Sequence, residues 1–213
     1  MRGQRVIDAY FSRDHFDDRE HQDMPSTYAK KLAATAVGQY NRYHEYSESD
    51  PELSAQIKRY WQDLGFDFPG VKTAWSAVFV SWCVKKAGAT GKEFAFAAAH
   101  AKFVKAAIQN ALKGVGVFRG LQIDQYAPKV GDIVQNNRSG NKFTYDFART
   151  HSAYESHSAI VVEVGVDHDG HYLMTIGGNE SDSVRRKRIR LNNKGLIIQR
   201  KLNPYICVIQ DLK

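Results

Sequence analysis

The sequence predicts an α+β fold in which helices come first in the chain and an antiparallel sheet follows. Apolar residues recur at helical spacing in four segments between residues 25 and 112. From residue 131 onward the pattern changes to short runs rich in β-branched residues. Turn sequences such as Asp169-Gly170 join several of these runs. We therefore expect N-terminal helices packed on an antiparallel sheet of about five to six strands.

Length and composition indicate one folded domain with an appended arm. A chain of 213 residues with 43% apolar and 12% aromatic side chains can bury a full core. Residues 1–23 carry many Arg, Asp and His residues and few apolar anchors, which predicts a loosely held arm before a domain spanning 24–213. The sequence has no apolar run long enough to cross a bilayer and no secretory signal. Synthesis in the cytoplasm without a signal peptide is the expectation.

The formal charge of +7 predicts attraction to polyanions but does not choose among nucleic acid, anionic lipid and wall polymers. The strongest basic run is Arg185-Arg186-Lys187-Arg188-Ile189-Arg190, which on a strand favours a solvated edge that resists aggregation. An anionic partner is the second interpretation. No nucleic-acid-binding signature accompanies the run, so no specific nucleic acid is expected as a partner.

Each of the four predicted helices has its own start or stop signal. Pro25 and Ser26 open the first, and Asp50-Pro51 opens the second. Glycines end the later ones. The four helices are expected over residues 25–43, 51–64, 73–88 and 94–112.

Six runs carry the strand pattern, and Cys207 lies in the last of them. Cys83 lies in the apolar stripe of the third helix, so both cysteines are expected to be buried thiols rather than parts of a disulfide or metal framework. The strands are expected over residues 131–137, 157–166, 171–176, 184–191, 195–202 and 204–212.

Ser76 lies in the first turn of the apolar helix 73–88, around which we organise the functional interpretation. A hydroxyl there is close to free backbone N–H groups and to the positive end of the helix dipole, which favours a developing negative charge. Serine at a helix start is more often a cap or a small packing residue. A nucleophilic Ser76 therefore requires a histidine base from elsewhere in the chain.

His157 is the predicted base, because it begins the strand run HSAIVVEV. Alternation places His157, Ala159 and Val161 on one face of that strand. A hairpin through Asp169-Gly170 would return the next strand beside His157, so Asn179 could fix the tautomer of the imidazole. The plainer interpretation is a strand-end histidine and a glycine-rich turn.

Five segments, in order, carry a resemblance: WSAVFVSWCVKKAG, FAAAHAKFV, YAPKVGDIV, HSAIVVEV and IGGNESDSV. Over about residues 27 to 210 the chain resembles a bacterial family of unknown function, which is similar to the CHAP and NlpC-type papain-like peptidoglycan hydrolases. The resemblance implies a papain-like fold and amide hydrolysis in cell-wall peptides. Its roles fall on Ser76 as nucleophile, His157 as base and Asn179 as orienting residue. Serine stands where the wider superfamily has cysteine.

The same resemblance implies an amidase or endopeptidase without a cofactor, delivered to the cell wall of a target cell by secretion or lysis. An antibacterial effector of this kind would have an immunity protein or a secretion-system component as partner. Metal binding by His100, His151 and His157 lacks a diagnostic spacing, so no metal is expected. The residues expected to line the cleft or bind substrate are Trp75, His100, Tyr154, Glu155 and Glu180.

Two other functions stay open on the sequence. One is a catalytically silent module that binds the cell wall and keeps the cleft without the chemistry. The other is an amidase or acyltransferase that uses the same residues on a substrate outside the wall. For His100 alone, a satisfied packing histidine is the plainer interpretation.

Overall fold

The structure is a computed structural model that describes residues 24–213, so the predicted arm of residues 1–23 lies outside the described residues. A six-stranded sheet has the order β1-β6-β2-β3-β4-β5, and every pairing in it is antiparallel. The predicted α+β class is confirmed. The helices are α2 (Thr27–Tyr43), α3 (Pro51–Leu64), α4 (Ser76–Ala87), α5 (His100–Lys113) and α6 (Tyr145–Thr150). The strands are β1 (Phe118–Leu121), β2 (Ile133–Asn137), β3 (Ser156–Asp167), β4 (Gly170–Glu180), β5 (Ser183–Arg190) and β6 (Tyr205–Asp211).

The four predicted helices are confirmed. Their glycine ends follow the expected chemistry, but Asp50, the predicted cap of α3, makes no capping hydrogen bond through its side chain. The Ser26 hydroxyl accepts a hydrogen bond from the backbone N–H of Ala29 at 3.0 Å and so caps α2. Gly65 ends α3 in the left-handed conformation, with φ of 76°. In the part of the chain that the structure describes, no helix is long and apolar enough to cross a membrane.

The predicted start of the fourth helix is wrong by six residues, because residues 94–99 lie outside α5. The Ser81 hydroxyl donates to the carbonyl oxygen of Ala97 at 2.9 Å, and the N–H of Ala97 donates to that same hydroxyl at 3.1 Å. A buried serine of α4 thus bonds both backbone groups of Ala97, which a helix would have paired with other backbone groups. Helix α5 begins only at His100.

Five of the six predicted strand runs form strands, and the run 195–202 does not. Among these residues only Ile197 pairs, through an isolated bridge to Leu191. Both side chains are buried against one face of the sheet, so this segment covers the sheet instead of extending it. The sequence interpretation also missed β1 and α6, which are short.

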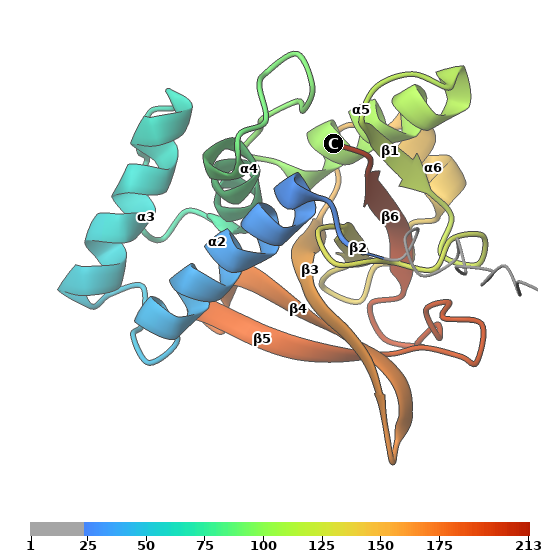
Figure 1. Ribbon diagram of the computed structural model, residues 1–213. Helices are drawn as coiled ribbons and strands as arrows, with labels where there is room; N and C mark the ends of the chain where they lie inside the picture. Colours follow the sequence, from blue (N-terminus) through green and yellow to red (C-terminus); the bar gives the residue numbers. More distant parts are fainter. Residues whose placement is uncertain (1–23) are drawn as a thin grey trace, which may run out of the picture.

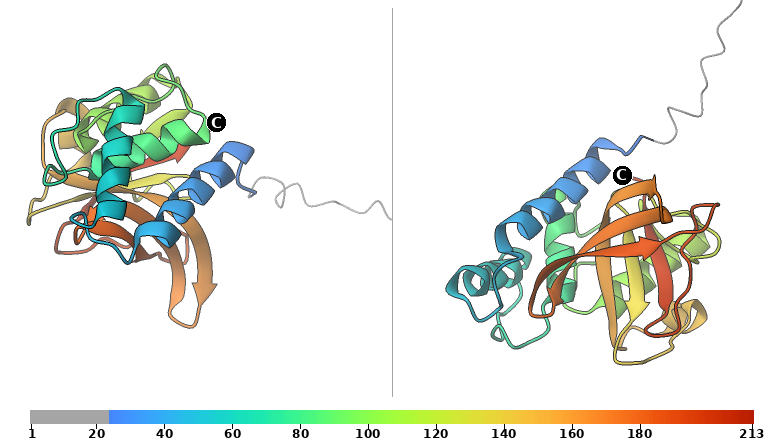
Figure 2. Two further views of the ribbon diagram at one scale, coloured as in Figure 1. Left: turned by 90° about the vertical axis from the view of Figure 1, so that its left-hand side faces the viewer. Right: turned by 90° about the horizontal axis from the view of Figure 1, so that it is seen from below.

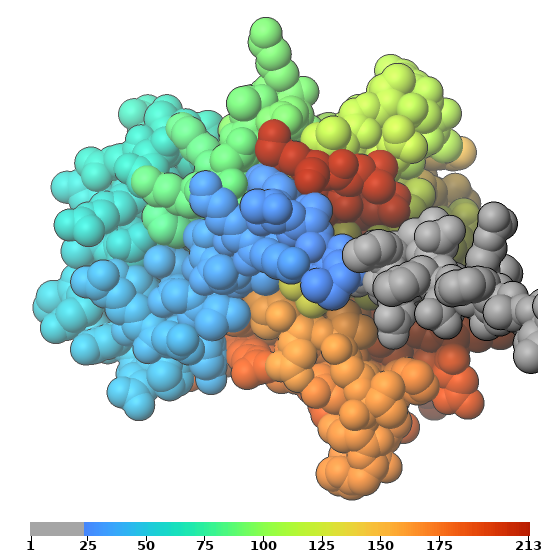
Figure 3. Space-filling model, in the orientation of Figure 1, coloured from blue at the N-terminus to red at the C-terminus, as the bar shows by residue number. Residues whose placement is uncertain are grey.

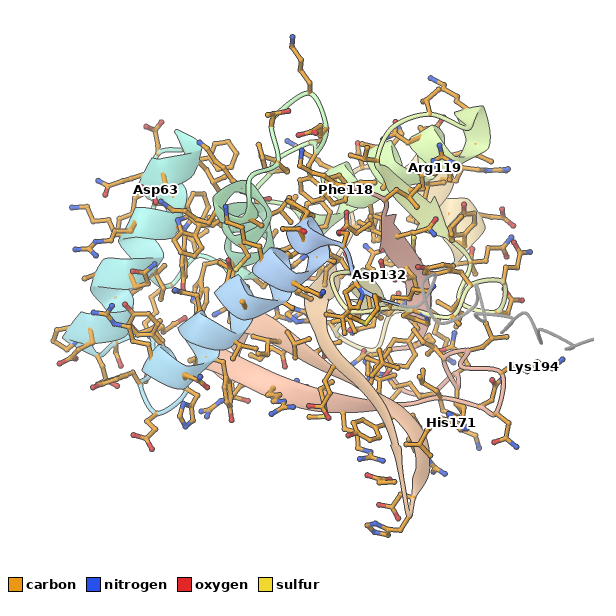
Figure 4. All side chains as sticks on the ribbon, viewed as in Figure 1. Asp63, Phe118, Arg119, Asp132, His171 and Lys194 are labelled. Atoms are coloured by element: carbon orange, nitrogen blue, oxygen red, sulfur yellow. The ribbon has the colours of Figure 1, made fainter. Side chains whose placement is uncertain are left out.

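Within residues 24–213, helices cover one face of the sheet and not the other. Figures 1 and 2 show α2 and α4 against β3, β4 and β5, with α3 outside α4 and α5 beside β1. Figure 4 shows Asp63 on α3, where its carboxylate accepts a hydrogen bond from the Trp82 indole of α4 at 2.8 Å. The other face of the sheet carries a second apolar cluster that contains no helical residue.

The basic run forms β5, an edge strand of the sheet, as predicted. Two of its cations pair with acids of β3, the strand beyond β4: Arg186 with Glu163 and Arg188 with Asp167. These acids belong to the long β3–β4 hairpin, whose tip projects from the body of the molecule in Figure 3. Cross-strand ion pairs therefore account for much of the charge in this run.

Asp132, labelled in Figure 4, joins the beginning of β2 to the end of β6. Its carboxylate accepts from the backbone N–H groups of Lys129 at 2.7 Å and Asp211 at 2.8 Å. Burial raises the pKa of Asp132 to about 7. The predicted strand GDIVQNN thus begins with a buried carboxyl group that has a structural role.

Gly178 lets β4 approach the start of α4 at a distance that no other residue allows. A Cβ atom at this position would lie 2.5 Å from Trp75 and 2.7 Å from Phe79, both fully buried. The backbone of β4 therefore packs directly on two aromatic rings, and neither ring has space to move.

We predict that Gly178→Ala lowers the free energy of unfolding by about 1–3 kcal/mol, because the added methyl group overpacks this contact. Gly38→Ala is the matched control. Gly38 is exposed within α2 and has no atom within 4 Å of the added Cβ, so the same change should stabilise the protein by about 0.5–1 kcal/mol. Urea unfolding measures both variants. If the two substitutions change the free energy of unfolding equally, the close contact of Gly178 with Trp75 and Phe79 is contradicted.

Candidate functional site

Ser76 is the first residue of α4, and no side chain caps this helix start. The helical hydrogen bonds begin with the N–H of Phe79, which donates to the carbonyl oxygen of Trp75 at 2.9 Å. The preceding N–H groups of the first turn have no acceptor within the helix. They belong to the same first turn as Ser76.

The Ser76 hydroxyl is hydrogen-bonded to a histidine, but to His100 rather than to His157. The distance from Ser76 Oγ to His100 Nε2 is 2.7 Å, and both residues are buried. His100 is the first residue of α5 and follows the irregular segment 94–99. The sequence interpretation placed His100 only among the residues that line the cleft or bind substrate.

The environment of His100 keeps its imidazole neutral. Burial lowers the pKa of His100 well below its usual value, and the nearby His157 and Arg138 lower the pKa further. Its Nδ1 atom is buried and has no hydrogen-bond partner in the described part of the chain. A neutral imidazole has one nitrogen that can accept a proton, and only Nε2 touches Ser76.

His157 faces away from the helices, which explains why Ser76 bonds a different histidine. The predicted alternation along β3 is confirmed, since Ile160 packs in the core with the helices while Val161 packs in the second cluster. His157 shares the face of Val161. The expected Ser76–His157 hydrogen bond is absent, although the rings of His157 and His100 touch, with centroids 5.4 Å apart.

The partner of His157 is Glu180, at 2.7 Å between Nε2 and Oε1. An ionised carboxylate only accepts, so Nε2 carries the proton of this bond. Gly177 makes room for the pair, because a Cβ atom there would lie 2.3 Å from Glu180 Oε1 and 2.7 Å from His157 Nε2. Burial raises the pKa of Glu180, but bonds and charges from His157 and Lys187 outweigh it and hold the pKa below its usual value.

The predicted Asn179–His157 hydrogen bond is also absent, because Asn179 points to the helix side of the sheet. Its Nδ2 atom donates to Glu48 Oε2 at 3.0 Å, and Trp75 Nε1 donates to the same oxygen at 3.0 Å. Asn179 has a left-handed backbone, with φ of 55°. The irregular pairing of β4 with β5 between Gly177 and Glu180 therefore brings Glu180 to the imidazole, one residue later than predicted.

Trp75 does not reach the cleft, against expectation. It is fully buried, and its ring stacks on Tyr60 with centroids 6.1 Å apart. Tyr154 and Glu155 do line the cleft at Ser76, as predicted.

Ser76 and His100 lie at the wall of a cleft of about 450 Å³, which also includes Arg138 and Asn179. A second pocket of about 530 Å³ contains His157 and Glu180. Arg138 and Asn179 line both cavities, so the two are adjacent.

Among residues 24–213, side chains with the spacing of a metal site gather only at the hairpin tip, where Asp167, His168 and Asp169 are all exposed. Asp167 already pairs with Arg188.

The chemistry available at Ser76 is that of a hydroxyl beside a neutral imidazole at an uncapped helix start, the arrangement that nucleophilic catalysis requires.

Residues 35–207 match a bacterial family described as "Uncharacterized protein conserved in bacteria (DUF2272)". The chain belongs to this family. The DUF2272 match covers every strand except part of β6, and it includes Ser76, His100, His157 and Glu180. Comparison with curated proteins and with solved structures found no match.

The sequence interpretation of this DUF2272 chain missed Glu48, which is buried and holds Trp75 and Asn179 together. Glu48 lies in the turn between α2 and α3, where an acidic residue is unremarkable. No pattern around it distinguishes a buried carboxylate from an exposed one. For His100, the segment FAAAHAKFV was a usable signal, because it places a histidine beside alanines at a helix start.

We predict that His100 makes the protein less stable in acid. The folded protein holds His100 neutral, whereas the unfolded chain protonates it near pH 6.5, so its contribution is complete above that pH and is lost as the pH falls. Below pH 6.5 the free energy of unfolding should fall more steeply in the wild type than in His100→Gln, by up to about 1.4 kcal/mol per pH unit. Urea unfolding between pH 7.5 and 4.5 measures the difference.

The control for this prediction is His168→Gln, because His168 is exposed at the hairpin tip. That variant should keep the pH dependence of the wild type. If His100→Gln also keeps it, His100 titrates alike in the folded and unfolded states, and the prediction is wrong.

Proposed function

We propose that this protein hydrolyses amide bonds in peptidoglycan peptides, with Ser76 as nucleophile and His100 as general base. The observation that carries the proposal is the 2.7 Å hydrogen bond between Ser76 Oγ, at the start of α4, and the buried, neutral His100, at the start of α5. The cleft beside this pair, about 450 Å³, has room for a peptide segment. The wall peptide as substrate rests on the resemblance to the CHAP and NlpC-type hydrolases.

The reaction follows from the groups present. His100 Nε2 takes the proton of Ser76 as Oγ attacks the amide carbon, and the free N–H groups at the start of α4 stabilise the oxyanion. When the C–N bond breaks, the leaving amine takes the proton from Nε2 and an ester forms on Ser76. His100 then takes a proton from water, whose oxygen attacks the ester, and returns that proton to Ser76 as the acid leaves.

His157 and Glu180 act in this proposal as a positioning pair. The His157 ring lies against the His100 ring, and the bond to Glu180 fixes its plane. His157 thus limits the rotation of His100 without touching Ser76.

The direct test of function is to incubate the purified protein with peptidoglycan and to identify released fragments by mass spectrometry. A hydrolase creates a new amino and a new carboxyl end at one bond. A silent binding module sediments with the wall and releases nothing, and this result would contradict the proposal.

We predict that Ser76→Ala lowers the rate of this hydrolysis by about 10³-fold or more. Folding should persist, because losing one buried hydrogen bond costs about 1–2 kcal/mol. Ser152→Ala, at an exposed loop position, is the control and should keep full activity. Undiminished hydrolysis by folded Ser76→Ala would exclude Ser76 as nucleophile.

Ser76→Cys is the complementary variant. It should keep or raise the activity and make it sensitive to thiol alkylation. The wild type should resist alkylation, because burial raises the pKa of both Cys83 and Cys207.

We predict that His100→Gln loses about 10³-fold in rate, while His157→Gln loses about 10- to 100-fold, because only His100 touches the nucleophile. Both rates are measured on the same peptidoglycan, with circular dichroism as the check on folding. The reverse order would return the role of base to His157, as the sequence alone predicted.

A further inference from the structure

The second pocket, which contains His157, carries an excess of positive charge. It encloses about 530 Å³ and lies on the face of the sheet away from the helices. Its ionised lining consists of four cationic side chains and a single carboxylate: Arg138, Lys187, Arg188, Arg200 and Glu180. None of these cations has a part in the proposed hydrolysis.

Two of the four cations are already neutralised. Lys187 pairs with Glu180, which also binds His157, so the one carboxylate of the pocket has two partners. Arg188 binds Asp167 with two hydrogen bonds, of 2.7 Å and 2.8 Å. The guanidinium groups of Arg138 and Arg200 remain for a ligand.

These two guanidinium groups stand on loops that are bonded to each other. The backbone N–H of Gly140 donates to Asn203 Oδ1 at 2.9 Å, which ties the loop after β2 to the loop before β6. Arg200 Nε donates to the carbonyl oxygen of Asn203 at 2.9 Å, and its guanidinium lies over the Tyr205 ring, 4.5 Å from the centroid. The backbone carbonyl oxygen of Arg138 accepts from the N–H of Asn141 at 3.0 Å, but its guanidinium makes no hydrogen bond or ion pair with any residue from 24 to 213.

The floor of the pocket is apolar. Val134, Ala159 and Ile189 are buried beneath it, while Leu202 at its rim is 70% exposed. A cationic rim above an aliphatic floor is complementary to a carboxylate on a short aliphatic chain. A bare phosphate or a nucleic-acid backbone would leave this floor uncovered.

The pocket adjoins the cleft of Ser76, because Arg138 and Asn179 line both. We propose that it is a subsite for a carboxylate-bearing aliphatic residue of the peptide whose amide bond lies at Ser76, with Arg138 and Arg200 binding the carboxylate. This inference rests on the proposed function for the position of the scissile bond. Such a subsite would make the protein selective for acidic peptides.

The test measures binding in the full chain with Ser76→Ala, so that no turnover interferes. The probes are a peptidoglycan stem tetrapeptide with free carboxylates and the same peptide with every carboxylate amidated. By isothermal titration calorimetry, the acidic peptide should bind about 10-fold more tightly or better. Adding Arg138→Gln should weaken the acidic peptide about 10-fold and leave the amidated peptide unchanged.

Lys194→Gln is the matched control. Lys194, labelled in Figure 4, lies on the loop between β5 and β6. It is not among the residues that line the pocket. Lys194→Gln and Arg138→Gln each remove one positive charge, so an effect of net charge alone would appear in both variants. We expect less than about a twofold change in affinity for either peptide.

Equal affinities for the two peptides, no binding of either, or equal effects of Arg138→Gln and Lys194→Gln would each overturn the subsite. Tight binding of an oligonucleotide without selectivity for the acidic peptide would also overturn it, in favour of nucleic acid. The outcome is separable from the proposed function. If the protein binds the acidic peptide selectively but never cleaves peptidoglycan, the subsite is supported and the hydrolase function is not. If it cleaves peptidoglycan without this selectivity, the hydrolase function is supported and the subsite is not.

Discussion

The close approach of β4 to the start of α4 sets the geometry of the whole site. Two successive residues without side chains make it possible. Gly178 faces the helices and lies directly on Trp75 and Phe79, while Gly177 faces the other way and leaves room for the His157–Glu180 bond. A methyl group at either position would separate the sheet from the helix or the imidazole from its carboxylate. One dipeptide therefore determines both environments in which the two histidines lie.

Glu48 locks this approach in place. Its buried carboxylate accepts from the indole of Trp75, just before α4, and from the side chain of Asn179, near the end of β4. If either donor moved away, the buried carboxylate would lose a hydrogen bond that water cannot replace. The free energy of that loss keeps both contacts in place. They also explain how Asn179 keeps a left-handed backbone, which is unfavourable for a residue with a side chain. That conformation turns the chain so that the next residue, Glu180, reaches His157.

Local signals sufficed for four helices, for five of the strands and for Ser76 at the start of α4, but not for the short elements β1 and α6. They did not suffice for the partners of the site residues. His157 and Ser158 alternate across β3, and which of them faces the helices depends on the packing of the whole sheet. His100 was hidden for a different reason: the residues before it have a helical pattern, yet Ser81 bonds the backbone of Ala97 and delays the helix. The role of Glu48 arises only from tertiary contacts, which no spacing in the sequence encodes.

Arg138 lines both cavities. Its charge is the smallest of the three named causes that lower the pKa of His100, after burial and His157. Under the proposed subsite, a substrate carboxylate bound to Arg138 would cancel part of that field and raise the pKa of His100 toward its usual value. A higher pKa makes the imidazole a stronger base. If His100 is the proposed general base, binding of an acidic peptide would thus strengthen it, whereas an amidated peptide in the same position would leave the pKa of His100 unchanged.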